Sequence, residues 1–116
     1  MLAVCARAEA LPFRDGAFDA AVESLAFCSI EEPESALAEI QRVVRPGGEL
    51  RMLDHVRAPG PLLGHLQDLL APAWLRVSGG CHLNRRVSAY LEAAGLRAER
   101  RLRRLRGTFE ELVVRL

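Results

Sequence analysis

The segment from residue 18 to residue 56 constrains the fold most, because it is patterned as strand, helix, tight turn and strand. Phe18–Leu25 is apolar on both sides of Glu23, which is typical of a strand buried on both faces. Residues 31–44 open with acids and a proline and then carry apolar side chains at helical spacing. Pro46-Gly47-Gly48 ends that helix, and the apolar run Leu50–Val56 follows at once. This order predicts a βαβ unit, with two parallel strands and a right-handed crossover.

The flanking segments extend this α/β pattern at both ends. A short apolar run, Leu2–Ala6, predicts one more buried strand before the unit. The segments after the unit predict a helix over Leu62–Leu70 that Pro72 ends, a helix closed by Gly95, and an antiparallel hairpin of Leu96–Arg106 and Phe109–Leu116. We therefore expect one α/β domain over residues 1–116.

The composition indicates a folded, water-soluble chain. Half of the 116 residues are hydrophobic and the net charge is +1, which excludes a disordered tail. No apolar run approaches the ~20 residues that span a bilayer, and the apolar start is too short for a secretory signal. The cysteines Cys5, Cys28 and Cys81 are odd in number and far apart, so we expect free thiols and a cytoplasmic location.

Arginines are concentrated near the carboxyl end, where residues 97–106 contain six of them. A nucleic-acid surface needs such density, but no aromatic residues are interleaved and the whole chain is nearly neutral. All 16 basic residues are arginine, so the bias is general. We expect an edge strand that is solvated and protected by charge, and no nucleic-acid partner.

Three segments resemble a known family in their order along the chain. They are Ala8-Glu9-Ala10-Leu11-Pro12-Phe13, then Gly16-Ala17-Phe18-Asp19, then residues 39–48, which end in Arg45-Pro46-Gly47-Gly48. Together they resemble class I methyltransferases that depend on S-adenosylmethionine, of the kind related to ubiquinone and menaquinone C-methyltransferases. Residues 54–56, 72–74 and 79–85 look like the methyltransferase type 11 subgroup, which includes thiol methyltransferase-like proteins.

The resemblance implies an incomplete Rossmann-like methyltransferase sheet, with parallel strands and a carboxyl-terminal antiparallel hairpin. The chain would supply the third to the seventh strands of the family's sheet. The amino-terminal half, with the glycine-rich cofactor loop, has no counterpart, since no Gly-x-Gly-x-Gly occurs. Three arrangements remain open: the strands close up, two chains complete each other, or the chain is a fragment of a longer protein.

The resemblance implies S-adenosylmethionine as cofactor and a small-molecule methyl acceptor. The residues in the family's cofactor positions are Ala8, Glu9, Ser24 and Leu25. Ser24 and Leu25 follow a predicted strand, at the edge where open α/β sheets bind ligands. Arg7 stands where relatives commonly carry an aspartate beside the adenine, and its guanidinium cannot accept a hydrogen bond.

The acceptor-side candidates lie on two loops and one strand end. They are Cys28, Cys81, His82, Asn84 and Arg85, with His55 as a candidate base. A purely structural loop with Asn84 as helix cap is the alternative. We expect no metal site, because His55, His65, Cys81 and His82 lack the usual ligand spacing. A non-catalytic module that forms a homodimer, or pairs with a complementing chain, is the alternative function.

Overall fold

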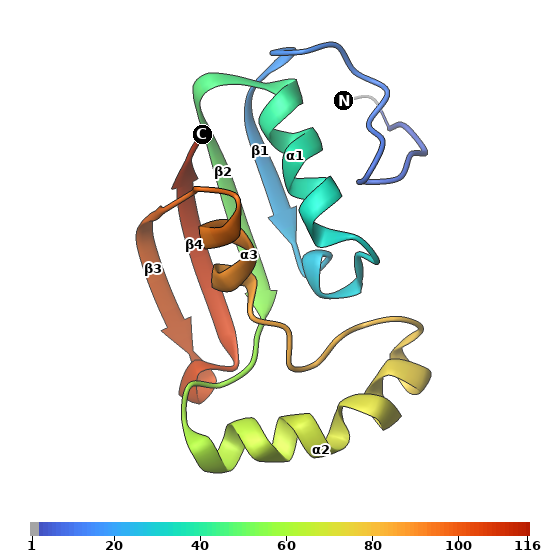
Figure 1. Ribbon diagram of the computed structural model, residues 1–116, viewed down its shortest axis with the longest axis vertical. Coiled ribbons are helices and arrows are strands. Elements are labelled where there is room, and N and C mark those ends of the chain that lie inside the picture. Colours follow the sequence, from blue (N-terminus) through green and yellow to red (C-terminus); the bar gives the residue numbers. More distant parts are fainter. Residues whose placement is uncertain (1–2) are drawn as a thin grey trace.

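The computed structural model describes residues 3–116 and contains one four-stranded sheet, in the order β1-β2-β4-β3 (Figure 1). The chain forms, in order, β1 (Phe18–Ser24), the 3-10 turn η1 (Phe27–Ser29), α1 (Pro33–Val43), β2 (Val44–His55), α2 (Pro61–Ser78), α3 (Val87–Ala93), β3 (Ala98–Arg104), the 3-10 turn η2 (Leu105–Gly107) and β4 (Phe109–Arg115).

The βαβ unit predicted from the sequence is confirmed. β1 pairs with β2 in parallel, and α1 connects them. β2 begins directly at Val44, so the Pro46-Gly47-Gly48 turn lies inside the long strand instead of before it. Gly47 has φ +81°, a conformation that favours glycine, and its N–H donates to the carbonyl of Leu116 beside β4.

Helices α1 and α3 cover one face of the sheet, and the hydrophobic core lies between them and the strands (Figure 1). The core residues are Phe27, Leu37, Leu50, Met52, Val56, Val87, Leu91, Leu96, Leu112 and Val114. Among residues 3–116, no helix lies on the opposite face of the sheet (Figure 1), where the Val22 side chain is 77% exposed.

The prediction of a buried strand over Leu2–Ala6 is wrong for the part of this segment that the structure describes. Leu2 lies outside them, and residues 3–6 are exposed and form no strand. A buried parallel strand needs neighbours on its edges, and in the described chain only β2 pairs with β1. The segment that follows is instead held against α1 by side-chain hydrogen bonds.

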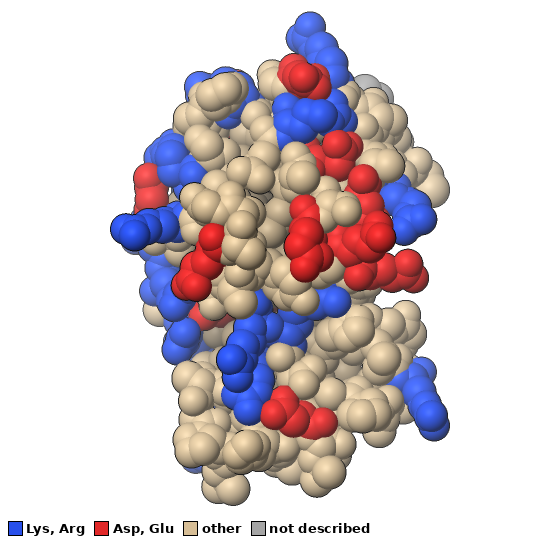
Figure 2. Space-filling model, viewed as in Figure 1, with Lys and Arg blue, Asp and Glu red and all other residues tan. Residues whose placement is uncertain are grey.

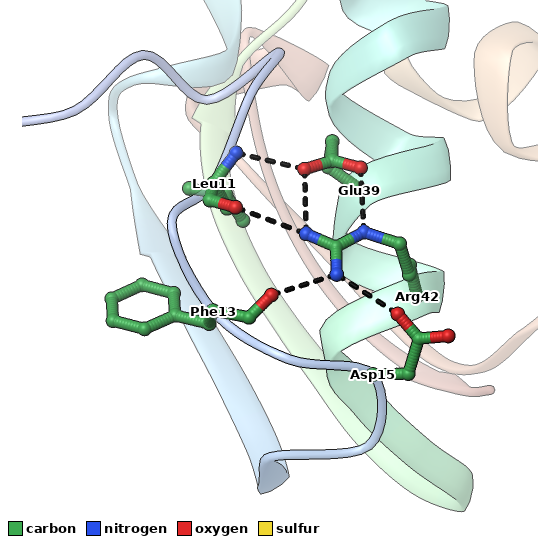
Figure 3. A network of polar contacts seen from close by, with 5 residues as sticks. All are labelled: Leu11, Phe13, Asp15, Glu39 and Arg42. Carbon is green, nitrogen blue, oxygen red and sulfur yellow. Dashed lines mark hydrogen bonds and ion pairs between the residues drawn. The ribbon is translucent and has the colours of Figure 1, made fainter.

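These hydrogen bonds converge on Arg42 of α1 (Figure 3). Its guanidinium donates to the carbonyls of Leu11 and Phe13 and to the carboxylates of Asp15 and Glu39. Glu39 also accepts the backbone N–H of Leu11 at 2.8 Å. One helical arginine thus fixes the loop that leads into β1.

The second helix is longer than predicted, because Pro72 lies inside α2 and does not end it. The helix stops at Gly79, which has the left-handed φ of +76°. Proline removes a single backbone donor, and this helix tolerates it on a largely solvent-exposed stretch. Exposed apolar side chains cover much of α2, and Figure 2 shows few charged groups over it. No helix among the described residues is long and apolar enough to cross a membrane.

The carboxyl-terminal hairpin is confirmed as antiparallel, with β3 at the edge of the sheet. β4 inserts between β2 and β3 and pairs antiparallel with both. Acidic side chains face several of the β3 arginines. Arg103 and Arg101 both lie within ion-pair distance of the buried Glu110.

Candidate functional site

Three segments meet at the carboxyl ends of the parallel strands β1 and β2. They are the turn after β1 with η1, the end of β2, and the loop of residues 79–85. Main-chain hydrogen bonds hold them together: Leu25 N–H donates to the carbonyl of Leu53, and His82 N–H donates to that of Cys28, both at 2.7 Å. This is the edge where open α/β sheets bind ligands.

The turn after β1 is built around Glu23. Its Oε1 accepts the backbone N–H groups of Ala26 and Phe27 at 2.6 and 2.8 Å. These two bonds close the turn in which Leu25 takes a positive φ of 54° and projects half-exposed. Ser24 is also exposed there. Both predicted cofactor residues on this turn are therefore accessible.

Two thiols and an imidazole lie together at this edge. The Sγ of Cys81 is 2.8 Å from Nε2 of His55, and the Sγ of Cys28 lies within 4.8 Å of both atoms. Burial raises the pKa of Cys28 to about 12, with the Cys81 thiol as the next cause. Burial lowers the pKa of His55, so its ring is neutral at pH 7.

A second group at the same edge is the carboxyl pair of Asp54 and Glu23. Asp54 is only 1% exposed, and burial raises its pKa to about 8, with the nearby carboxyl of Glu23 adding to the effect. Asp54 is therefore mostly protonated at pH 7. A carboxyl whose pKa is strongly shifted by burial and by a neighbouring charge is a candidate functional residue.

Four buried side-chain atoms within residues 3–116 have no hydrogen-bond partner: Glu23 Oε2, both oxygens of Asp54, and His55 Nδ1. Buried polar atoms in folded proteins are normally paired, since an unpaired one costs about 1–3 kcal/mol. Because these atoms are concentrated at one edge of the sheet, that edge is the candidate site.

The other predicted acceptor-side residues contribute to the framework of this edge. The guanidinium of Arg85 is buried and donates to the carbonyls of Phe27 and Ile30 at 2.6 and 2.7 Å. Asn84 donates to Asp68 of α2 at 2.9 Å. Burial, with a smaller contribution from Arg85, lowers the pKa of His82.

The remaining predicted cofactor residues, Ala8 and Glu9, lie beside the start of α1. Glu9 accepts the backbone N–H of Glu32 at 3.4 Å and pairs with Arg7 at 3.7 Å. Its own backbone N–H and that of Glu32 lower the pKa of Glu9, so this carboxylate stays charged. Arg7, noted above as a departure from the family, thus neutralises a neighbouring acid.

Sequence reasoning missed Glu23 as a site residue and gave Asp54 no distinct role. A signal for both was available, since each is an acid near the end of a segment that predicts a buried strand. Such a residue needs a partner when buried.

Comparison with known proteins agrees with the resemblance. Residues 2–52 match the family model described as a methyltransferase domain. Thiol S-methyltransferase TMT1B of Rattus norvegicus is 38% identical over 81 residues, 69% of this chain and 33% of the relative. The ubiquinone/menaquinone biosynthesis C-methyltransferase UbiE of Hahella chejuensis is 36% identical over 76 residues, 66% of this chain and 30% of that protein.

The fold is also similar to that of solved methyltransferases. The crystal structure of an S-adenosylmethionine-dependent methyltransferase from Mesorhizobium loti superposes with a TM-score of 0.71 at 17% identity, over 96% of this chain and 67% of that one. Residues 2–52 thus match a methyltransferase domain, and the chain is similar in sequence to class I methyltransferases, a class whose cofactor is S-adenosylmethionine. Within this class its sequence matches the methyltransferase type 11 family. It spans about a third of the length of the curated relatives it matches.

Proposed function

We propose that this chain takes part in methyl transfer from S-adenosylmethionine to a small-molecule acceptor. The observation that carries the proposal is the group of unpartnered buried polar atoms and thiols at the carboxyl ends of β1 and β2. The relative TMT1B is named for thiol methylation, which makes a small thiol the first acceptor to test.

The cofactor side of the proposed site is the turn after β1 together with the loop beside α1. Ser24 and Leu25 are exposed at the strand end, where they can contact a ligand. Glu9 offers a carboxylate that its neighbours keep charged. The family resemblance assigns cofactor contact to these three residues and to Ala8.

The acceptor side would be formed by the loop of residues 79–85 and η1. Cys28, Cys81, His82 and Asn84 belong to these segments, and buried Arg85 acts as a positioning residue because it holds the carbonyls of η1. Bound S-adenosylmethionine supplies an electron-poor methyl group. The work of the chain is then to align the acceptor and to exclude water. His55, neutral at pH 7, can take the acceptor's proton at Nε2.

Calorimetric titration of the folded chain with S-adenosylmethionine tests cofactor binding. We expect saturable heat, weakened by Glu9→Gln and by Ser24→Ala but unchanged in Glu34→Gln, whose side chain is exposed on the first turn of α1. The absence of heat at millimolar ligand, with native circular dichroism, would exclude binding by this chain alone. Transfer of a labelled methyl group to a small thiol then tests the reaction itself.

A specific observation also favours a second function, a non-catalytic module that pairs with another chain. The sheet face opposite α1 and α3 has no covering helix among the described residues, and β1 is an edge strand. A groove of about 500 Å³ crosses the sheet near Val22, Arg51 and Leu102. Exposed apolar surface of this kind is typical of association sites.

Light scattering over a wide concentration range tests this second function. If the face pairs with another copy, the mass rises toward a dimer. Val22→Glu should then restore the monomer, whereas Val77→Glu on α2, at a similarly exposed valine, should not. A monomer at every concentration contradicts self-association.

A further inference from the structure

The cluster of Cys28, His55 and Cys81 has a ligand chemistry that the proposed function does not use. The three residues come from separate segments: η1, the last position of β2, and the loop after α2. Their ligand atoms all lie within 4.8 Å of one another. The sequence predicted no metal site here because spacing along the chain carries no such signal, yet the fold brings these three residues together.

Backbone contacts hold each member of the cluster in place. The carbonyl of Cys28 accepts the N–H of His82 at 2.7 Å, which joins η1 directly to the loop after Cys81. The N–H of Cys81 donates to the hydroxyl of Ser78 at 3.1 Å. Both cysteine side chains are buried, and the His55 ring packs edge-on against Phe109 with ring centroids 6.2 Å apart. The cluster is therefore part of the packed fold and not a chance meeting of exposed side chains.

We propose that Cys28, Cys81 and His55 bind a zinc ion. Two sulfurs and one imidazole nitrogen are a ligand set that zinc prefers. At zinc–ligand distances of about 2.3 Å for sulfur and about 2.05 Å for nitrogen, tetrahedral ligands lie about 3.5–3.8 Å apart. Small side-chain rotations suffice: Cys81 Sγ and His55 Nε2, which are 2.8 Å apart, need to separate slightly, and Cys28 Sγ already lies within 4.8 Å of both.

Three protein ligands leave one of the four zinc positions open to water or to another ligand. Binding replaces two thiol protons by the metal, so both cysteines become thiolates and two protons are released to solvent. His55 binds through Nε2 as a neutral ring. In the zinc-bound state His55 is thus a ligand and not the base considered above. The inference does not depend on methyl transfer, since zinc binding is measured without cofactor or acceptor.

The test uses the full chain under reducing conditions, stripped with a chelator and titrated with zinc or with cobalt as a spectroscopic probe. We expect one equivalent of metal and, with cobalt, the sulfur charge-transfer and intense visible bands of a tetrahedral thiolate site. Cys28→Ser and Cys81→Ser should each weaken binding by about tenfold or more. Cys5→Ser is the matched control, because Cys5 is exposed and outside the cluster, and it should bind as the unchanged chain does.

Other outcomes would overturn the inference. One is that folded, fully reduced protein retains less than a tenth of an equivalent of metal. The others are a cobalt spectrum without thiolate bands, and a loss of metal binding in Cys5→Ser alone. Because a cysteine variant can fail to fold, the cobalt spectrum of the unchanged chain decides independently of any substitution. His55→Ala adds a second check, since the thiolate bands should persist while the intensity and affinity fall.

Discussion

The side chain of Arg42 holds an irregular segment of the chain in place by hydrogen bonds. Within the described residues 3–17 the loop before β1 contains no strand, and the guanidinium of Arg42 supplies most of its hydrogen bonds to α1 (Figure 3). The ion pair with Arg42, followed by the N–H of Leu11, lowers the pKa of Glu39 to about 2. The charged form of Glu39 is therefore favoured by folding.

This shift predicts how acid affects stability. A carboxyl whose pKa falls on folding stabilises the native state above its unfolded pKa, here the ordinary 4.5, and that contribution disappears as the pH falls toward 2. We measure urea unfolding from pH 7 to pH 2.5 and expect Glu39→Gln to lower the urea concentration at the midpoint at neutral pH. Below pH 4.5 this midpoint should fall less steeply with pH in the variant than in the unchanged chain. Glu34→Gln, at an exposed position on the same helix, should follow the unchanged chain. Parallel acid profiles for the two variants would contradict this role of Glu39.

The candidate site shows the limit of sequence reasoning at the level of residues. The turn of Ser24 and Leu25 could be placed because it follows a predicted strand, and strand ends have a known role in open sheets. The proximity of Cys28, His55 and Cys81 could not be predicted, because it depends on the path of the loop after α2 and on how η1 packs. Residues far apart in sequence carry no periodic signal that links them.

At the level of elements, local pattern was sufficient wherever an element is stabilised by its immediate neighbours. The β1-α1-β2 unit and the carboxyl-terminal hairpin were predicted because strand, helix and turn signals follow one another directly. Leu2–Ala6 has the composition of a strand, but a strand forms only where its backbone pairs with a neighbouring strand. Residues 3–6 have no backbone partner in the described sheet. Pro72 disfavours a helix by itself, but the helical turns on both sides of it keep α2 continuous.

The Pro46-Gly47-Gly48 turn inside β2 gives a prediction at this level. A Cβ on Gly48 would lie 2.6 Å from the carbonyl oxygen of Asp19 and 2.9 Å from that of Arg45, so backbone would have to move. We expect Gly48→Ala to lower the free energy of unfolding by about 1–3 kcal/mol. Gly60→Ala, where a Cβ meets nothing within 4 Å, should change it by about 0.5 kcal/mol or less. Denaturant unfolding measures both, and equal effects would show that Gly48 is not packed as described.

Across the whole molecule, stability is unevenly distributed. The sheet with α1 and α3 contains the core, whereas only Gly64 and Gln67 of α2's 18 residues are buried. Gln67 ties the first half of α2 to the main chain of Val56 and Ala58 through its amide. Beyond Asp68 the helix presents mainly exposed apolar side chains to solvent.

We therefore expect the second half of α2 to open before the sheet unfolds. Trp74, the one tryptophan of the chain, is 42% exposed there and reports on this half by fluorescence. On heating, the Trp74 fluorescence should change at a lower temperature than the far-ultraviolet circular dichroism. Amides of residues 70–78 should exchange on the order of a hundredfold faster than those of β2. Coincident transitions and equal protection would mean that α2 unfolds together with the core.

The position of β4 affects how the chain can be made. It pairs with β2 from Glu49↔Arg115 to His55↔Phe109, and it is the strand that connects β3 to the rest of the sheet. When the ribosome has synthesised β1, α1 and β2, one of the two partners of β2, the strand β4, is still missing. Such distant pairings slow folding. The nascent chain must keep the apolar side chains of β2 from aggregating until residues 109–115 emerge, so expression should respond strongly to chaperone supply and to growth temperature.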